Sequence, residues 1–314
     1  MISAILGRDG FVLDEHPMPT AGPGEIAVRT LALGICEGDL FHYRMRQEMG
    51  DEPLLLGHEG TGIVTDIGQG VNGLTIGDRV TTLGGPYATC YNVPAEMAVR
   101  LPEKMDPVYA LGEPLACCVH ASARFGVRPG DRVAMIGCGF MGMVCMQLAR
   151  MQGAAEITAI APLAWRRAIA LALGADTAYA PDAVPALSDA LQSRFDVVIE
   201  ATGVQSGLDL VAPLTRQHGR AILIGYHQTS EGIRQVDMQQ WNFKALDIIN
   251  GHVRRNDEKL QAMRSALALL DAGLLRIEPL VTAYPLADIQ IAFADLANRK
   301  EGLFKAVLIP EAAG

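Results

Sequence analysis

Four residues near the start of the chain carry side chains that could bind a metal ion: Cys36, His58, Glu59 and Glu113. Their local sequences all contain glycine: Gly34-Ile35-Cys36, Gly57-His58-Glu59-Gly60 and Gly112-Glu113-Pro114. One sulfur, one nitrogen and carboxylate ligands suit a catalytic zinc that keeps an open coordination position. A single such cysteine is more often a buried apolar residue, and a single such histidine is more often structural. The combination predicts a zinc site.

A glycine-rich turn follows a short apolar strand and has the sequence Gly137-Cys138-Gly139-Phe140-Met141-Gly142. It matches a dinucleotide-binding fingerprint in its expected context, with a strand before it and a helix after it. The first glycine allows the tight turn, the second lets the backbone approach the pyrophosphate, and the third lets helix and strand pack closely. The amides at the helix start then face the phosphates. Together with the metal ligands, the turn indicates metal-assisted hydride transfer.

Two kinds of pattern divide the chain. The first 115 residues are punctuated by Gly, Asp and Pro and predict a mostly antiparallel region, with strands at Glu25–Leu33, Gly62–Gly68 and Gly77–Leu83. From about Val119, predicted strands and helices alternate. The strands are Arg132–Ile136, Glu156–Ile160, Phe195–Glu200, Arg220–Ile224 and Leu246–Asn250, and the helices are Phe140–Met151, Ala164–Leu173 and Gln205–Leu214. This alternation predicts an α/β fold with a parallel, doubly wound sheet.

The last part of the chain is predicted to form helices at Glu258–Ala272 and Ala287–Asn298 and a final strand at Leu303–Ile309. We expect it to return to the first domain. The predicted domains are therefore a catalytic domain of residues 1–119 and 251–314, and a dinucleotide-binding domain of residues 120–250.

Composition narrows the class of protein. Of 314 residues, 50% are hydrophobic and 19% are charged, which indicates a well-packed globular protein large enough for two domains. The formal net charge of -9 disfavours binding to nucleic acid or to a membrane surface. Six cysteines are too few for a secreted disulfide scaffold, and the first residues lack the features of a signal peptide. We expect a cytoplasmic protein with reduced cysteines that acts on a small molecule.

On these motifs the chain resembles the zinc-dependent medium-chain dehydrogenases, the family of alcohol, sorbitol and threonine dehydrogenases, over essentially its whole length. Besides the frames of Cys36 and His58 and the glycine turn, the matching stretches are Gly77-Asp78-Arg79-Val80, Glu113-Pro114-Leu115-Ala116 and Glu200-Ala201-Thr202-Gly203. The resemblance implies a mostly-β GroES-like catalytic domain, a Rossmann domain, one catalytic Zn²⁺ and NAD or NADP as the cofactor.

The resemblance also implies residue roles. Cys36 and His58 would ligate zinc, Glu59 would lie beside the metal as ligand or alternate ligand, and Glu113 would occupy the position of the third protein ligand. That position is a glutamate in the polyol and threonine branches of the family. An alternative for Glu113 is a helix N-terminal residue that is stabilised by the helix dipole. Asp39 would hold the imidazole of His58.

Two of the chain's departures from the family pattern concern the zinc content and the proton relay. Thr81 to Cys90 forms only a short connector where the family has a cysteine-rich lobe for a structural zinc, so we expect one zinc rather than two. Gly38 stands where a serine or threonine often begins the proton relay. The relay would then use His42 or water beside Glu59, although His42 is equally interpretable as a surface residue on a short helix.

The residues expected to contact the cofactor are Gly137, Gly139, Phe140, Met141, Gly142, Ala161, Arg166, Thr202, Gly203 and Gly225. The second strand of the nucleotide-binding domain should end in an acid for the adenosine ribose, but it is followed by Ala161 and Pro162. Without that carboxylate, Arg166 or Arg167 could pair with a 2′-phosphate. We therefore hypothesise NADP preference or dual use; the alternative is that both arginines form a solvated helix face.

The substrate is less well determined. The glutamate-type metal site resembles that of polyol and sugar-alcohol dehydrogenases, which favours a secondary alcohol of a polyol or sugar; hydroxylated metabolites are equally compatible. Trp241, Asn242 and Phe243 could border the substrate, or Trp241 could fill the core.

Two other functions remain open, a zinc-free quinone or enoyl reductase of the same superfamily and a non-catalytic nucleotide-binding homologue. By analogy with the family we expect a homodimer or homotetramer.

Overall fold

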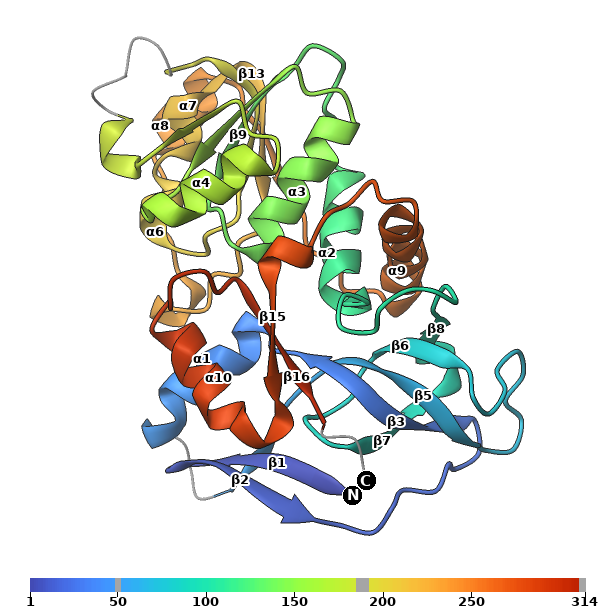
Figure 1. Ribbon diagram of the computed structural model, residues 1–314. Coiled ribbons are helices and arrows are strands. Elements are labelled where there is room, and N and C mark those ends of the chain that lie inside the picture. Colours follow the sequence, from blue (N-terminus) through green and yellow to red (C-terminus); the bar gives the residue numbers. More distant parts are fainter. Residues whose placement is uncertain (49–51, 185–191, 311–314) are drawn as a thin grey trace. The chain divides into compact units, whose positions relative to one another are not determined.

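The computed structural model describes residues 1–48, 52–184 and 192–310 (Figure 1). The chain divides into two compact units: the first unit is Met1–Ala116 with Arg255–Gly314, and the second unit is Cys117–Arg254. The second unit contains a parallel sheet and the first is mostly β, as expected from the sequence.

The second unit is built on a six-stranded sheet in the order β11-β10-β9-β12-β13-β14. These strands are β9 (Arg132–Ile136), β10 (Glu156–Ile160), β11 (Thr177–Tyr179), β12 (Phe195–Glu200), β13 (Thr215–Leu223) and β14 (Asp247–Asn250). All five pairings are parallel. In chain order this is 3-2-1-4-5-6, the arrangement of a Rossmann fold, which confirms the predicted doubly wound sheet.

The helices of the second unit agree with the prediction except at one place. They include α3 (Phe140–Met151) and α4 (Ala164–Ala172), which lie on the near face of the sheet in Figure 1. The predicted helix Gln205–Leu214 is wrong as a single element, because it is split into α6 (Gln205–Leu208) and α7 (Val211–Leu214). Pro213 lacks the N–H that a continuous helix would donate to Asp209, and its ring would clash with that carbonyl.

A short helix that the sequence did not predict, α8 (Met238–Phe243), precedes β14. Trp241 packs from this helix against the buried cluster that contains Phe195, Val198 and Val211. It is therefore core filling, one of the two interpretations offered by the sequence. Phe243, at the end of the same helix, is 81% exposed.

In the described part of the first unit the strands form two sheets. The larger has the order β15-β16-β3-β5-β6-β8, with β7 also paired to β3, and the smaller has the order β2-β1-β4. Their strands are β1 (Ile2–Gly7), β2 (Gly10–Glu15), β3 (Glu25–Gly34), β4 (Leu54–Leu55), β5 (Glu59–Ile67), β6 (Arg79–Leu83), β7 (Cys90–Pro94), β8 (Ala98–Arg100), β15 (Val281–Pro285) and β16 (Lys305–Ile309). β16 pairs antiparallel with β3, so this last strand belongs to the larger sheet of the first unit.

Helices pack against these sheets and enclose a hydrophobic core in the first unit. The first unit contains α1 (Glu37–Met45), α9 (Asn256–Asp271) and α10 (Ile289–Ala297), and α2 (Gly112–Ser122) begins in it. α1 contacts α10, and Figure 1 shows the two side by side. Beneath them the rings of Phe11, Tyr43 and Tyr87 surround Phe293, with centroid separations of 4.6, 5.3 and 5.7 Å from the Phe293 ring.

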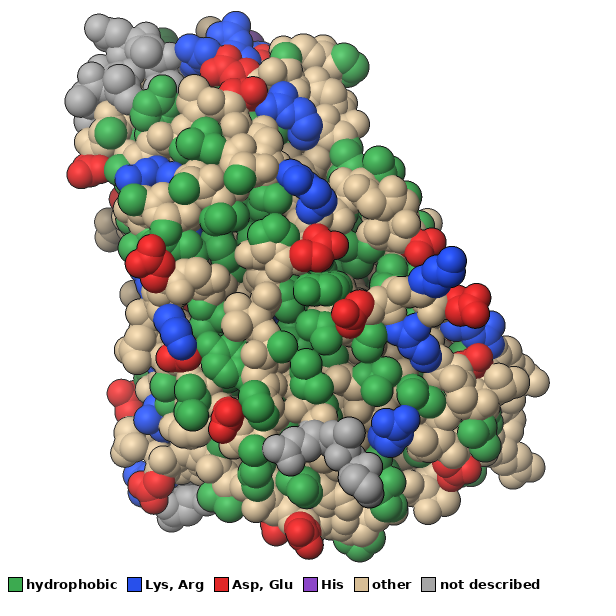
Figure 2. Space-filling model, viewed as in Figure 1, with side chains coloured by type: hydrophobic (Ala, Val, Ile, Leu, Met, Phe, Trp, Pro, Cys, Tyr) green, Lys and Arg blue, Asp and Glu red, His purple; other side chains and the backbone are tan. Residues whose placement is uncertain are grey.

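The surface visible in Figure 2 carries charges of both signs. On the face shown in Figure 2, basic side chains are scattered among acidic ones rather than gathered in one patch. Among the residues that the structure describes, no helix combines the length and apolar character that a membrane span needs. All six cysteines are free thiols.

The helix α10 offers a matched test of its packing. Ile289 is 2% exposed and Ile291, on the same helix, is 53% exposed. Ile289→Ala is expected to lower the free energy of unfolding by about 2–5 kcal/mol, because it leaves a cavity in the core. Ile291→Ala is expected to change it by less than about 0.5 kcal/mol. Urea unfolding followed by circular dichroism measures both, and equal effects would contradict the assigned faces.

Candidate metal and dinucleotide sites

Three of the predicted metal ligands come together in the first unit. One ligand atom each from Cys36, His58 and Glu59 lies within 4.8 Å of the others. Cys36 follows β3 and caps α1, and Glu59 begins β5 directly after His58. The antiparallel register of β3 and β5 places Leu33 opposite Gly60, which brings these two loops to the same end of the sheet.

Glu59 is buried and faces a lysine from the last strand. The Nζ atom of Lys305 lies 2.8 Å from Oε1 and 2.6 Å from Oε2 of Glu59, and it also donates to the Ile35 carbonyl at 2.8 Å. Burial alone would lower the pKa of Lys305, but the surrounding acidic groups, Glu59 first among them, together outweigh burial and raise the pKa, so the ammonium stays charged. The contact to Oε2 is close but lacks hydrogen-bond geometry, so this buried oxygen has no hydrogen-bond donor.

A small residue on β3 makes room for this ion pair. A Cβ atom added at Gly34 would overlap with Oε2 of Glu59 and would lie 3.2 Å from Cε of Lys305. The glycine two positions before Cys36 therefore has a steric role that its sequence context did not reveal. Any larger side chain at this position would displace the Glu59 carboxylate.

A carboxylate lies beside the imidazole of His58. Oδ2 of Asp39 lies 3.7 Å from Nδ1 of His58 and accepts a hydrogen bond of 2.6 Å from the hydroxyl of Tyr87. Burial, and then the charge of Asp39, raise the pKa of Tyr87, so the phenol remains a donor. Asp39 therefore lies beside His58, and its role in holding the imidazole stays a prediction. Tyr87 is a further neighbour of this carboxylate that sequence reasoning missed.

Glu113 lies outside the group of three. It is in the first turn of α2, and its Oε1 accepts from Nζ of Lys259 at 2.8 Å. Burial would raise the pKa of Glu113, but Lys259, together with the smaller effects of His58 and Lys305, outweighs burial, and the pKa is lowered. The hydroxyl of Thr81 accepts from the Gly112 N–H at 3.3 Å and donates to the Gly60 carbonyl at 3.2 Å. Thr81 therefore joins the start of β5 to the start of α2.

His42 is exposed on α1, where its ring contacts Phe41. The exposure of its side chain favours the surface interpretation over a role in a proton relay.

The donor set of the cluster fits zinc. A thiol, an imidazole and a carboxylate match the ligands that zinc takes in catalytic sites. Burial, and then the charge of Glu59, raise the pKa of Cys36 to about 12. A divalent cation among these donors would supply the positive charge that the thiolate and the buried Glu59 oxygen lack.

The glycine turn of the second unit has the local geometry that its sequence indicates. Gly137 follows β9 with φ of 96°, in the left-handed region that favours glycine. A Cβ atom added at Gly142 would overlap with the Gly137 carbonyl oxygen. The third glycine therefore permits close packing of α3 on the turn, and Phe140, Met141 and Gly142 form the first turn of α3.

The remaining predicted cofactor residues lie at the carboxyl ends of neighbouring strands. Ala161 follows β10, Thr202 and Gly203 follow β12, and Gly225 lies just beyond β13. The buried carboxylate of Glu200 accepts from the backbone N–H groups of Thr202 and Gly203 at 2.6 and 3.0 Å. Ligands of doubly wound sheets bind at this edge.

Beyond the predicted set, two further residues stabilise the loop after β13. Nε2 of His227 lies 3.2 Å from Glu200, and Nδ1 of His227 accepts from Nε of Arg234 at 2.9 Å. Sequence reasoning did not identify this pair, because no local motif marks it.

The two arginines near Ala161 have different positions. The Nη1 atom of Arg167 donates to the carbonyls of Ala161 and Pro162 at 2.7 and 2.8 Å, so it holds the loop after β10. Arg166 lies 5.0 Å above the ring of Trp165, and its Nη1 would be 3.9 Å from a Cβ atom at Gly139. Arg166 is therefore the one beside the glycine turn.

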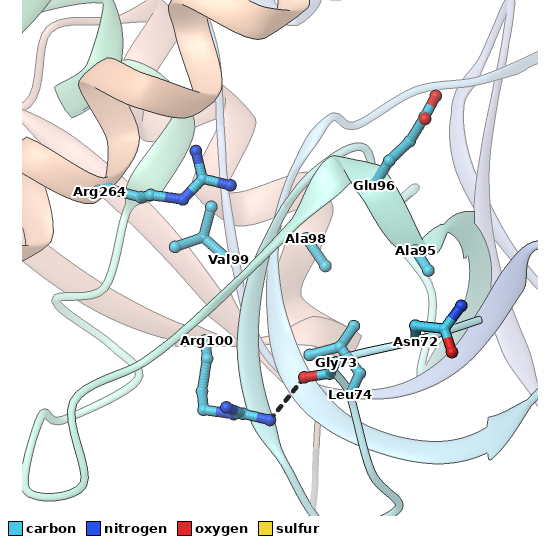
Figure 3. A pocket seen from close by; sticks show the side chains of 9 residues that line it. All are labelled: Asn72, Gly73, Leu74, Ala95, Glu96, Ala98, Val99, Arg100 and Arg264. Carbon is cyan, nitrogen blue, oxygen red and sulfur yellow. Dashed lines mark hydrogen bonds between the residues drawn. The ribbon is translucent and has the colours of Figure 1, made fainter.

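A surface hollow of the first unit lies apart from these residues (Figure 3). Its lining includes Gly73, Arg100 and Arg264, and Nη2 of Arg100 donates to the Gly73 carbonyl at 2.8 Å. None of the residues predicted for metal or cofactor binding lines it. We therefore assign it no part in the reaction.

Comparison with known proteins identifies the family. Residues 22–103 match the alcohol dehydrogenase GroES-like domain, and residues 141–271 match the zinc-binding dehydrogenase domain. Sorbitol dehydrogenase from Gallus gallus is 30% identical, with 96% of this chain and 94% of that protein covered. The chain belongs to the zinc-binding medium-chain dehydrogenases. It is a zinc-dependent NAD(P) dehydrogenase.

One further relative and one solved structure are similar to this chain. L-Threonine 3-dehydrogenase from Pyrococcus horikoshii is 29% identical, with 87% of each chain covered. A structure from Sinorhizobium meliloti, described as a zinc-binding dehydrogenase bound to NADP, has the same fold. Its TM-score is 0.87 at 24% identity, and the comparison covers 98% of this chain and 99% of that one.

Substitution of Gly34 tests directly whether the Glu59–Lys305 pair is packed as closely against the β3 backbone as described. Gly34→Ala is expected to lower the free energy of unfolding by about 1–3 kcal/mol and to reduce the zinc retained, because the methyl group displaces a buried carboxylate. Gly7→Ala is the control, because a Cβ atom at Gly7 meets only the Gly10 carbonyl oxygen at 3.8 Å. Denaturant unfolding and metal analysis measure both effects. A Gly34→Ala protein with wild-type stability and zinc would show that the pair is not confined as described.

Proposed function

We propose that this dehydrogenase transfers hydride between NAD(P) and a secondary alcohol of a polyol, a sugar or another hydroxylated metabolite, with the ketone as the oxidised form. The observation that supports this most is the cluster of Cys36, His58 and Glu59 within 4.8 Å. It combines zinc-type donors with a nearby glutamate, Glu113, at the position that is a glutamate in the polyol and threonine branches.

In this proposal Cys36 and His58 hold the zinc, with Glu59 within reach and Glu113 beside it. When bound, zinc supplies Lewis acidity that lowers the pKa of the substrate hydroxyl. Asp39 and Tyr87 fix the imidazole of His58, and Lys305 neutralises Glu59. We propose a single zinc per chain, because only residues 84–89 join β6 to β7.

The proton route is the part of the site that differs from the family pattern. Gly38 provides no hydroxyl, and His42 is exposed on α1. We therefore favour water beside Glu59 as the path by which the substrate proton leaves. The imidazole of His58 is half-exposed, with 40% of its side chain accessible.

The cofactor proposal is NADP preference or dual use. Ala161 provides no carboxylate after β10, and Arg166 lies near Gly139 in the glycine turn. Pairing of this guanidinium with a 2′-phosphate would supply a charge-assisted contact that NAD lacks.

We also propose assembly as a homodimer or homotetramer through the second unit. β14 forms an edge of the parallel sheet, and Ile248 on this strand is 39% exposed. An exposed edge strand is a template for pairing with a second copy. Light scattering of the purified protein tests this, and a monomer at working concentration would contradict it.

The metal assignment predicts that removal of the His58 imidazole abolishes zinc binding and turnover but leaves cofactor binding intact. His58→Ala is expected to remove zinc binding and to abolish oxidation of a polyol panel, because it deletes one of two non-carboxylate ligands. NAD(P)H binding, followed by fluorescence, should persist, because the glycine turn lies in the other unit.

His42→Ala provides the matched control on α1. It is expected to retain zinc and most of the turnover, because the ring is exposed. Turnover by metal-free His58→Ala protein would refute the zinc mechanism, and a large loss of kcat in His42→Ala would restore His42 to the relay.

The cofactor proposal predicts that one substitution, at Ala161, changes the preference between NADP and NAD. Ala161→Asp is expected to lower kcat/KM for NADP at least about tenfold, because a carboxylate there repels the 2′-phosphate. Its effect on NAD should be small or favourable, because an acid at this place accepts from the ribose hydroxyls. Steady-state kinetics with both cofactors measures this. A strong NAD preference in the wild-type enzyme would refute the proposal.

A further inference from the structure

Two acidic side chains near the sulfur and nitrogen donors each face a lysine of their own. Glu59 pairs with Lys305 on β16, and Glu113 pairs with Lys259 on α9, with the closest N–O distances at 2.6 and 2.8 Å. The two differ in one respect. A carboxylate oxygen of Glu59 belongs to the group of donor atoms within 4.8 Å, whereas Glu113 does not. The Glu59 carboxylate is within reach of a metal bound to this group, whereas the Glu113 carboxylate is paired with Lys259 outside the group.

The packing of α9 fixes the position of Lys259. Lys259 and Met263 are four residues apart and share a face of the helix. Met263 is fully buried, and a Cβ atom added at Gly112 would lie 2.9 Å from its Cγ. The start of α2 therefore packs on this face of α9, which places the ammonium of Lys259 against Glu113.

The pair is well shielded from water. The side chains of Lys259 and Glu113 are 19% and 10% exposed. Charges at such depth are screened little by salt, and removing one partner leaves the other uncompensated. Without the ammonium, the Glu113 carboxylate would lose the cation that acts on it most strongly. Lys305 also acts on Glu113 but is held by Glu59 and the Ile35 carbonyl, so a metal ion held by Cys36 and His58 would be a cation that Glu113 could bind instead.

We infer that Lys259 is a positioning residue for the metal, whose ammonium holds Glu113 off the ion and so keeps a coordination position open. This inference rests on the proposed metal site. A catalytic zinc has three protein ligands and one open position, whereas thiolate, imidazole and two carboxylates together would close it. Removing the charge of Lys259 frees Glu113 to bind the metal.

Cobalt(II) substitution tests this, because the visible spectrum of the bound ion reports its ligands. Lys259→Met is expected to shift the cobalt absorption bands and to slow removal of the metal by a chelator at least tenfold. Lys259→Arg keeps the charge and should keep the wild-type spectrum. Lys300→Met, which removes a lysine from the surface pair with Asp295, is the matched control and should also leave the spectrum unchanged.

A double-mutant cycle separates the inference from general damage. Glu113→Gln alone should keep the wild-type cobalt spectrum, because Glu113 does not bind the resting metal. Lys259→Met in the Glu113→Gln background should also show the wild-type spectrum and release rate. A changed spectrum in Glu113→Gln, or an unchanged one in Lys259→Met, would overturn the inference. A wild-type protein without a thiolate-to-cobalt band would instead overturn the proposed metal site and the inference with it.

Discussion

A charged carboxylate cannot remain inside the first unit without a cation against it, and the ion pair of Glu59 with Lys305 meets this requirement. The pair depends on the order of the sheet. β16 must lie beside β3 for Lys305 to reach both Glu59 and the Ile35 carbonyl. Gly34 must be small for the carboxylate to fit. Since Cys36 and His58 lie within one or two residues of these contacts, the same constraint also positions the sulfur and nitrogen donors.

The two units position their functional residues by different means. In the first, antiparallel pairing of β3 with β5 joins loops that are distant in sequence, and buried ion pairs set the charge. In the second, parallel strands end at one edge, and the buried Glu200 gathers the backbone N–H groups of the loop after β12. The metal donors therefore depend on a few long-range contacts, whereas the dinucleotide turn depends mainly on local glycine geometry.

These differences explain what could be predicted from the sequence. Phe140–Met151 and Glu156–Ile160 were predicted at their observed bounds, because buried parallel strands and their helices have strong local patterns. β2 was missed, because four of its six residues are exposed and give no alternation. Lys305 could have been noticed as a lone cation in an apolar strand, which demands a buried acid. Lys259 gave no such signal, because charged residues are common near helix starts; only the tertiary structure pairs it with Glu113.

The most direct test of this account is zinc K-edge X-ray absorption on the purified holoenzyme, compared with the Cys36→Ser variant. The account predicts one sulfur at about 2.3 Å and a remaining shell of nitrogen and oxygen at about 2.0–2.2 Å, with the sulfur lost in Cys36→Ser. A shell of several sulfurs, or a single sulfur that persists in Cys36→Ser, would show that the metal is held elsewhere and would contradict the site built on Cys36, His58 and Glu59.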